Sequence, residues 1–257
     1  MAVSYIAVEG QHDAALIGCL LSNGGFRLVK KRSIVDSAFE RYSVLKLQDS
    51  LVGRPPECHF WKRGEHSVGL HPVGGDSQLI LAGATVEAQI IGPISAVGFF
   101  IDADLETPAN RLRELARDIL KMNVQPGFQL PGSAGQIHQG PPRCGVFVFP
   151  NNQDQGAIET ILESCAEVAY PDLFEKSLTY LKNIDCNKLT ATERTRLATG
   201  SNEKKARLSV IGSALRPTAA IQNTIREDRW ICTETLDLDL VLKVRNFLRE
   251  LLGEPTI

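Results

Sequence analysis

Apolar and polar positions follow two patterns along the first 169 residues, and each pattern predicts a different element. Short apolar runs rich in β-branched and aromatic residues predict strands; these lie at 4–8, 26–31, 95–104 and 145–150. Apolar residues that recur every three or four positions predict helices; these lie at 13–23, 77–91, 108–122 and 155–169. The alternation indicates an α/β fold, with a mainly parallel sheet sandwiched by helices.

Two regions depart from this alternation. Residues 32–76 contain only short β-like pieces, so we interpret them as an insertion of irregular and β character, in which Gly64 would suit a hairpin turn. Residues 170–257 contain helical patterns and no strong strand. We therefore expect an α/β domain at 1–169 and a helical appendage at 170–257. The last helix has an apolar stripe at 240–252 that would suit either a core or a homodimer.

Composition places the chain among ordinary globular proteins. It has 257 residues, of which 43% are hydrophobic and 23% charged, and a net charge of -2 that excludes bulk attraction to nucleic acid. Residues 188–229 are locally basic, with 9 Lys and Arg against 4 Asp and Glu, which would suit a phosphate backbone or a solvated helical surface equally well. No run of about 18 apolar residues predicts a membrane span. The acidic N-terminus does not resemble a signal peptide, and six cysteines without a C-x-x-C pair indicate reduced thiols in a cytoplasmic protein.

Acidic residues follow two of the predicted strands. Glu9 ends the first strand, and Asp102 and Asp104 end the most strongly apolar one. Ligands of parallel sheets bind at the carboxyl ends of strands, so neighbouring strands would bring these carboxylates together. Clustered carboxylates repel one another unless a cation neutralises them, and oxygen ligands suit Mg²⁺ or Mn²⁺. Asp13 would either join them or favour its helix N-terminus.

The two acidic elements resemble the Toprim family, which includes primases, topoisomerases and nucleases. That family has an apolar strand ending in Glu, often with Gly after it, and a later strand ending in D-x-D. The chain matches these elements with YIAVEGQHDAALIGCLL and AVGFFIDADLE. The resemblance implies a Toprim-like Rossmannoid fold. It also implies that Glu9 is an acid/base or metal residue, and that Asp102 and Asp104 are metal ligands.

Over residues 4–255 the chain also looks like an uncharacterised Toprim-related branch near the overcoming-lysogenization-defect nucleases. The matching segments are GVFVFPNNQDQGAIETIL and EKKARLSVIGSALRP. Glu159 fits the glutamate of a G-x-x-E element, whereas Asn151 stands where the branch has Asp. Related nucleases use a lysine beyond D-x-D, and Lys204 or Lys205 matches it.

The function implied by this resemblance is Mg²⁺- or Mn²⁺-dependent hydrolysis of nucleic-acid phosphodiesters, or nucleotidyl transfer. The implied metal ligands are Glu9, Asp13, Asp102, Asp104 and Glu159. Catalysis is assigned to Glu9, Asp102, Asp104 and Lys204. Gly10 would let the backbone approach the substrate, which Lys205 would also bind. The chain has no P-loop, so any ATPase would be a separate partner.

Other functions remain open. The main alternative is a non-catalytic Toprim-like module that binds nucleotide or protein, and Asn151 favours it. A haloacid-dehalogenase phosphatase would need D-x-D-x-[TV] near the N-terminus, and glycosyltransferases lack the E-G-x-x-D element. Four residues lie close enough in sequence to suggest Zn²⁺, but their spacing matches no familiar finger; they are Cys58, His59, His66 and His71.

Overall fold

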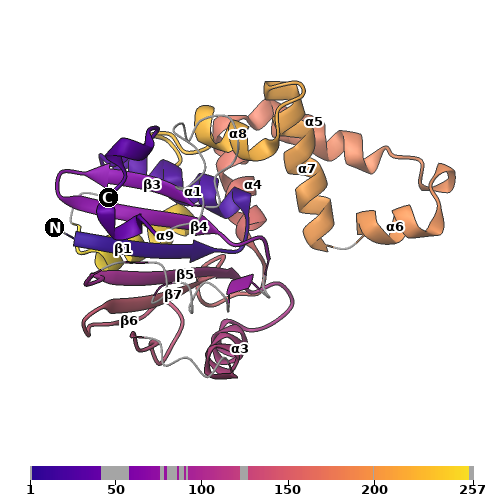
Figure 1. Ribbon diagram of the computed structural model, residues 1–257. Helices are drawn as coiled ribbons and strands as arrows, with labels where there is room; N and C mark the ends of the chain where they lie inside the picture. Colours follow the sequence, from indigo (N-terminus) through magenta and orange to yellow (C-terminus); the bar gives the residue numbers. More distant parts are fainter. Residues whose placement is uncertain are drawn as a thin grey trace.

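A mixed sheet forms the centre of the molecule. The computed structural model describes residues 2–41, 58–75, 78, 79, 86, 90, 92–121, 127–198 and 200–254. In these residues the strands are β1 Ala2–Val8, β2 Arg27–Leu28, β3 His59–Arg63, β4 His66–Pro72, β5 Ala96–Asp102, β6 Ile137–His138 and β7 Arg143–Phe149. Their order in the sheet is β2-β3-β4-β1-β5-β7-β6 (Figure 1).

The four central strands are parallel, and the short outer strands are antiparallel. β1 pairs in parallel with β4 on one side and β5 on the other, and β5 pairs in parallel with β7. β2, β3 and β6 each pair antiparallel to their neighbours. The predicted, mainly parallel α/β sheet is therefore confirmed. β1, β5 and β7 match the three strongest predicted strands, whereas only Arg27–Leu28 of the expected strand 26–31 pairs.

The described part of residues 32–76 has the expected irregular and β character, and its strands belong to the central sheet. Two 3₁₀ turns, Arg32–Ile34 and Ser37–Phe39, precede β3 and β4. These strands form a hairpin around Gly64, whose φ of 53° is left-handed, and β4 lies beside β1 near the sheet centre. Their short, mixed sequences did not show that one of these strands, β4, lies between two others. The helix expected at 77–91 lies mostly outside the described residues.

Helices cover both faces of the sheet. The helices that the structure describes are α1 Gln11–Asn23, α3 Pro108–Lys121, α4 Ile158–Ala169, α5 Pro171–Lys182, α6 Ala191–Ala198, α7 Gly200–Leu215, α8 Ile221–Glu227 and α9 Asp239–Leu252, with a 3₁₀ turn at Cys186–Lys188. Alternate residues of β1 enter two hydrophobic clusters, because successive side chains of a strand point to opposite faces. One cluster includes α1, α4 and α9, and the other includes α3.

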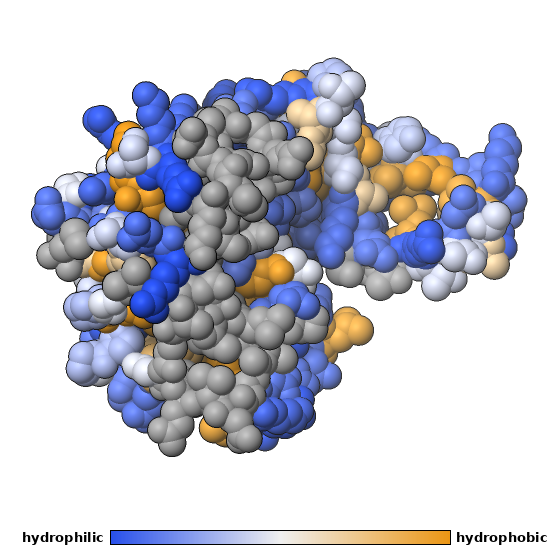
Figure 2. Space-filling view, viewed as in Figure 1, coloured by the Kyte–Doolittle hydropathy of each residue, from blue (hydrophilic) through white to orange (hydrophobic). Residues whose placement is uncertain are grey.

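The C-terminal helices do not form a single appendage. The apolar stripe of α9 packs on β5 and β7, where Gly98 makes room for Leu251 and Gly145 for Phe247. The stripe thus belongs to the core, and the boundary expected at residue 170 does not separate α9 from the sheet. By contrast, α5, α6 and α7 extend beyond the sheet (Figure 1), and their visible surface mixes hydrophilic and hydrophobic residues (Figure 2). No helix among the described residues is long and apolar enough to cross a membrane.

Candidate carboxylate site

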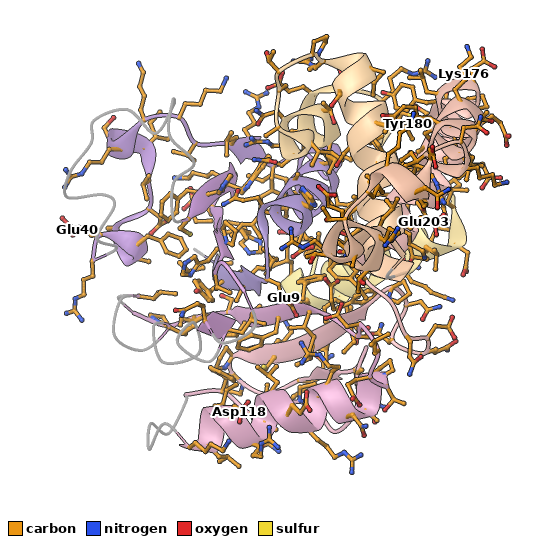
Figure 3. All side chains as sticks on the ribbon, turned by 90° about the vertical axis from the view of Figure 1, so that its right-hand side faces the viewer. Glu9, Glu40, Asp118, Lys176, Tyr180 and Glu203 are labelled. Atoms are coloured by element: carbon orange, nitrogen blue, oxygen red, sulfur yellow. The ribbon has the colours of Figure 1, made fainter. Side chains whose placement is uncertain are left out.

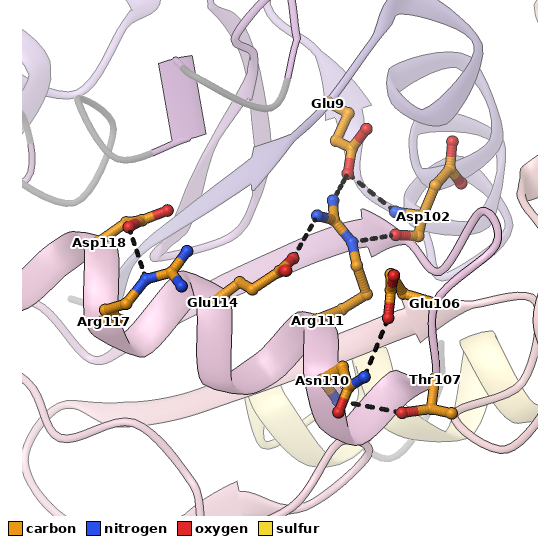
Figure 4. A network of polar contacts seen from close by, with 9 residues as sticks. All are labelled: Glu9, Asp102, Glu106, Thr107, Asn110, Arg111, Glu114, Arg117 and Asp118. Carbon is orange, nitrogen blue, oxygen red and sulfur yellow. Dashed lines mark hydrogen bonds and ion pairs between the residues drawn. The ribbon is translucent and has the colours of Figure 1, made fainter.

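The ends of β1 and β5 bring Glu9 and Asp102 together, as expected. Glu9 directly follows β1, and Asp102 is the last residue of β5. The backbone N–H of Asp102 donates to Oε1 of Glu9 at 2.9 Å (Figure 4). Because the two strands are parallel neighbours, both residues lie at the carboxyl edge of the sheet. In the view of Figure 3, Glu9 lies between α3 and the helical region that includes Glu203.

Two buried acids come from the helices that begin at this edge. Asp13 lies in the first turn of α1, is 4% exposed and accepts a 2.7 Å hydrogen bond from the backbone of Gly10. Glu159 lies in the first turn of α4 and is 3% exposed. The same helix is joined to β5, because the N–H of Ile158 donates to Oδ1 of Asp102 at 3.0 Å. The starts of α1 and α4 therefore place acidic side chains beside the strand ends.

The charges of this cluster are incompletely neutralised. Burial, together with the charges of Glu9 and Glu159, raises the pKa of Asp13 to about 8 despite its bond to Gly10. Burial and the charges of Asp13, Glu159 and Asp104 raise the pKa of Asp102 well above its ordinary value. Oε2 of Glu159 is buried without a hydrogen-bond partner. A nearby cation would lower the cost of keeping these carboxylates ionised.

Three cationic or titratable side chains border the cluster. Nη2 of Arg111 lies 3.2 Å from Oε1 of Glu9. On the other side, Nζ of Lys205 and Nδ1 of His12 lie 3.8 and 3.9 Å from Oε1 of Glu159. Lys205 is the expected lysine that reaches the site. Lys204 instead donates to Thr160, the residue after Glu159, at 2.9 Å and lies 3.7 Å from Glu163, one turn further along α4.

Three other expected residues are placed differently from the four clustered acids. Asp104 is exposed, with a left-handed φ of 53°, and its backbone pairs with Gly156. Asn151 accepts from the backbone of Gln153 and donates to Asp154, which commits its side chain to a local turn. Gly10 has an extended backbone, and a Cβ there would meet only Oδ2 of Asp13, at an ordinary 3.7 Å. The protein's own packing therefore does not require glycine at this position, and the approach of a substrate to Gly10 stays a prediction.

The cluster suits a divalent cation by charge and donor type. Among the residues that the structure describes, no three His, Cys, Asp or Glu side chains form a ready-made metal cage. Mg²⁺ seldom needs one, because at phosphoryl-transfer sites it is held by one or two carboxylates, water and substrate phosphate. The oxygen-only donors and the unpartnered oxygen of Glu159 fit that mode of binding.

The residues considered for zinc have other surroundings. His66 contacts Ser4 and Glu254, and Nδ1 of His71 lies 2.6 Å from the hydroxyl of Tyr5. Cys58 is buried next to β3, which begins at His59. These side chains are not among the described groups that would hold a metal.

The comparisons with known proteins place the chain in a family. Residues 3–252 match the model described as "Protein of unknown function (DUF3226)". The chain belongs to this family. The search of curated proteins gave no match. The crystal structure of hypothetical protein PH0156 from Pyrococcus horikoshii OT3 is similar, with a TM-score of 0.50 and 13% identity, covering 98% of this chain and 95% of that one; at this identity the similarity shows the fold alone.

Two residues of this DUF3226 site were not expected from the sequence. Arg111 lies one turn into α3, and His12 lies in the first turn of α1. Both helices begin close after strands that end in acids, so residues of their first turns face the same edge. That spacing is a usable signal for His12. For Arg111 it is weak, because α3 has several arginines and only the packing of the helix selects one.

Proposed function

We propose that this protein is a Mg²⁺-dependent enzyme that hydrolyses nucleic-acid phosphodiesters, with nucleotidyl transfer as the same chemistry on another acceptor. The observation that supports it is the burial of Asp13 and Glu159 beside the half-buried Asp102, with the three within reach of one another's charges. Groups with strongly shifted pKa values concentrate at functional sites.

The residues divide into two roles. One or two carboxylates of the cluster formed by Glu9, Asp13, Asp102 and Glu159 would hold the cation together with water and substrate phosphate, and the cation polarises a phosphoryl oxygen when bound. Lys205, which is 50% exposed in its side chain and faces Glu159, would attract the phosphate that approaches the cluster. Lys204 and Asp104, which the resemblance also assigns to the site, would act from its rim.

A binding module without catalysis is the second candidate. The local turn of Asn151 supports it, because an acid at that position would add a ligand. The lack of a three-ligand cage among the described side chains points the same way. A Toprim-like fold is itself part of the proposal, because the structural comparison establishes only the α/β architecture.

Cleavage assays with a matched pair of variants separate these functions. Purified protein is incubated with supercoiled plasmid and with RNA, with Mg²⁺ or with EDTA. Glu159→Gln removes a buried acid of the cluster, whereas Glu167→Gln changes an exposed acid on the same helix. The proposal expects cation-dependent cleavage by wild type and Glu167→Gln but not by Glu159→Gln. Absence of cation-dependent cleavage by wild type would refute the enzyme and favour the module that binds nucleotide or protein.

A further inference from the structure

Arg111 joins three parts of the candidate site. Its Nη2 contacts Oε1 of Glu9 at 3.2 Å, and its Nε donates to the backbone carbonyl of Asp102 at 2.8 Å (Figure 4). Its Nη1 donates to Glu114 on the same helix at 3.1 Å. One guanidinium thus connects the end of β1, the end of β5 and the first turns of α3.

The surroundings of Arg111 separate it from the other arginines of its helix. Its side chain is only 11% exposed, whereas that of Arg117, on the same helix, is 60% exposed and contacts its neighbour Asp118. Ordering and burying an arginine costs side-chain entropy and hydration. Its contacts to Glu9 and Asp102, at the edge where the acids cluster, offset that cost.

Oε1 of Glu9 accepts two hydrogen bonds. The N–H of Asp102 and the guanidinium of Arg111 converge on it, while Arg111 also holds the carbonyl of Asp102. The result is a closed loop of hydrogen bonds between Glu9, Asp102 and Arg111. Such a loop restricts the rotamers of Glu9, which has three rotatable side-chain bonds. It requires a side chain that presents several N–H donors in a fixed, forked geometry, as a guanidinium does.

We propose that Arg111 is a positioning residue, which fixes the carboxylate of Glu9 beside Asp102 and thereby increases the affinity of the cluster for a divalent cation. The second half of this inference rests on the proposed function, because it concerns the same carboxylates. Charge alone would have the opposite effect, because a nearby cation repels a metal ion. The two contributions therefore predict changes of opposite sign when Arg111 is replaced.

The test uses the full chain with two variants of Arg111 and one control. Arg111→Met keeps the apolar stem but removes every donor, Arg111→Lys keeps the charge but not the fork, and Arg117→Met is the matched control. Binding of Mn²⁺ is measured from the electron paramagnetic resonance signal of the free ion. Hydrogen exchange of the Asp102 amide in EDTA is measured by NMR, with the Phe100 amide of the same strand as an internal reference.

We expect the Mn²⁺ dissociation constant to rise about tenfold in Arg111→Met and about threefold in Arg111→Lys, with Arg117→Met unchanged. The Asp102 amide should exchange faster in both Arg111 variants, while the Phe100 amide does not. Equal or tighter Mn²⁺ binding by Arg111→Met, or unchanged exchange at Asp102, overturns the proposal. If wild type binds no Mn²⁺, the cation-dependent function and the proposed gain in affinity both fail, and the exchange data alone then decide whether Arg111 positions Glu9.

Discussion

The two ends of β1 lie in polar networks of opposite character. Near its amino end, Ser4 is fully buried at 0% exposure, and its Oγ lies 2.9 Å from Nε2 of His66. Nδ1 of His66 lies 2.7 Å from Glu254, which also pairs with Arg63. Both side-chain nitrogens of the histidine therefore have partners, and the acid has a cation. Near the carboxyl end, the acids Asp13 and Asp102 have backbone N–H donors and raised pKa values, and no ion pair to either is seen among the described residues.

This contrast shows that a buried chain of hydrogen-bonded side chains does not by itself mark a functional site. Ser4, His66 and Glu254 follow one another as in a hydrolase triad, yet the serine is sealed within the sheet and no substrate can reach it. Burial and the guanidinium groups of Arg63 and Arg143 lower the pKa of His66 to about 4, so it is neutral at neutral pH. That network connects the segment after α9 to the sheet. At the acidic edge, burial and the charges of neighbouring acids instead raise the pKa values of Asp13 and Asp102, and for this reason the proposed function is assigned to that edge.

The largest effect is expected from a substitution in the acidic cluster at the carboxyl end of β1. Asp102→Asn should lower cation-dependent cleavage by about 100-fold or more, because a neutral amide cannot balance a divalent cation. Folding should be unchanged, since Oδ1 of Asn can still accept from Ile158. Initial cleavage rates and thermal unfolding of both proteins test this. Asp118→Asn, at an ion-paired acid of α3, is the control, and an equal loss of rate in that variant would contradict the assignment.

A second prediction concerns the pH dependence of stability at the same end. The folded pKa of Asp13 is about 8, against an ordinary value of 3.8. Between these values the unfolded chain releases a proton that the folded chain keeps, so the stabilising contribution is complete below about pH 4 and is lost towards pH 8. The free energy of unfolding should fall in EDTA as the pH rises, by up to about 1.4 kcal/mol per pH unit from this group.

Urea unfolding at pH 5 and pH 8 measures this fall. Asp13→Asn should remove the part due to Asp13, because the amide still accepts from Gly10 but does not ionise, whereas the part due to the raised pKa of Asp102 remains. Mg²⁺ should restore part of the lost stability of wild type at pH 8 by binding the ionised cluster. An equally steep fall in the variant would show that other groups cause the pH dependence.

A third prediction concerns a substitution in the paired network near the amino end of β1. Glu254→Gln weakens the contacts to His66 and Arg63 and should lower the free energy of unfolding by about 1–3 kcal/mol. Because this network is at the opposite end of β1, Mn²⁺ affinity should not change. Chemical denaturation and Mn²⁺ binding, measured on the same preparation, test both statements. A change in Mn²⁺ affinity would mean that the two ends are coupled.

The smallest effect is expected from the two lysines at the rim of the acidic site, and it concerns the binding of nucleic acid. Lys205→Ala should weaken binding of a labelled oligonucleotide about threefold and reduce the salt dependence by about one phosphate contact. Lys204→Ala should have less effect, because its ammonium group is already engaged by Thr160 and Glu163. Titrations at several salt concentrations give both quantities. Equal effects of the two variants would mean that Lys204 contributes to phosphate binding as much as Lys205 does.

The central strands and the first acids were predictable because their signals are local. An apolar run that stops at Glu9 or at Asp102 marks both a buried strand and its carboxyl end. The place of β4 between β3 and β1 was not predictable, because a β-like piece such as HSVGLHP does not show which strands it pairs with. The burial of α9 on the sheet was likewise hidden, because an apolar stripe does not reveal which surface it covers.

The α/β alternation, the strand ends and the acids that follow them can be read from the chain, because they depend on residues close together in it. Which charges meet depends on the packing of distant segments. It brought Arg111 to Glu9, chose Lys205 over Lys204 for Glu159, and left Asp104 exposed. The physical reason is that neutralisation of a buried charge depends on distances of a few ångströms between distant segments. Those distances are set by how helices pack on the sheet, which no short pattern records.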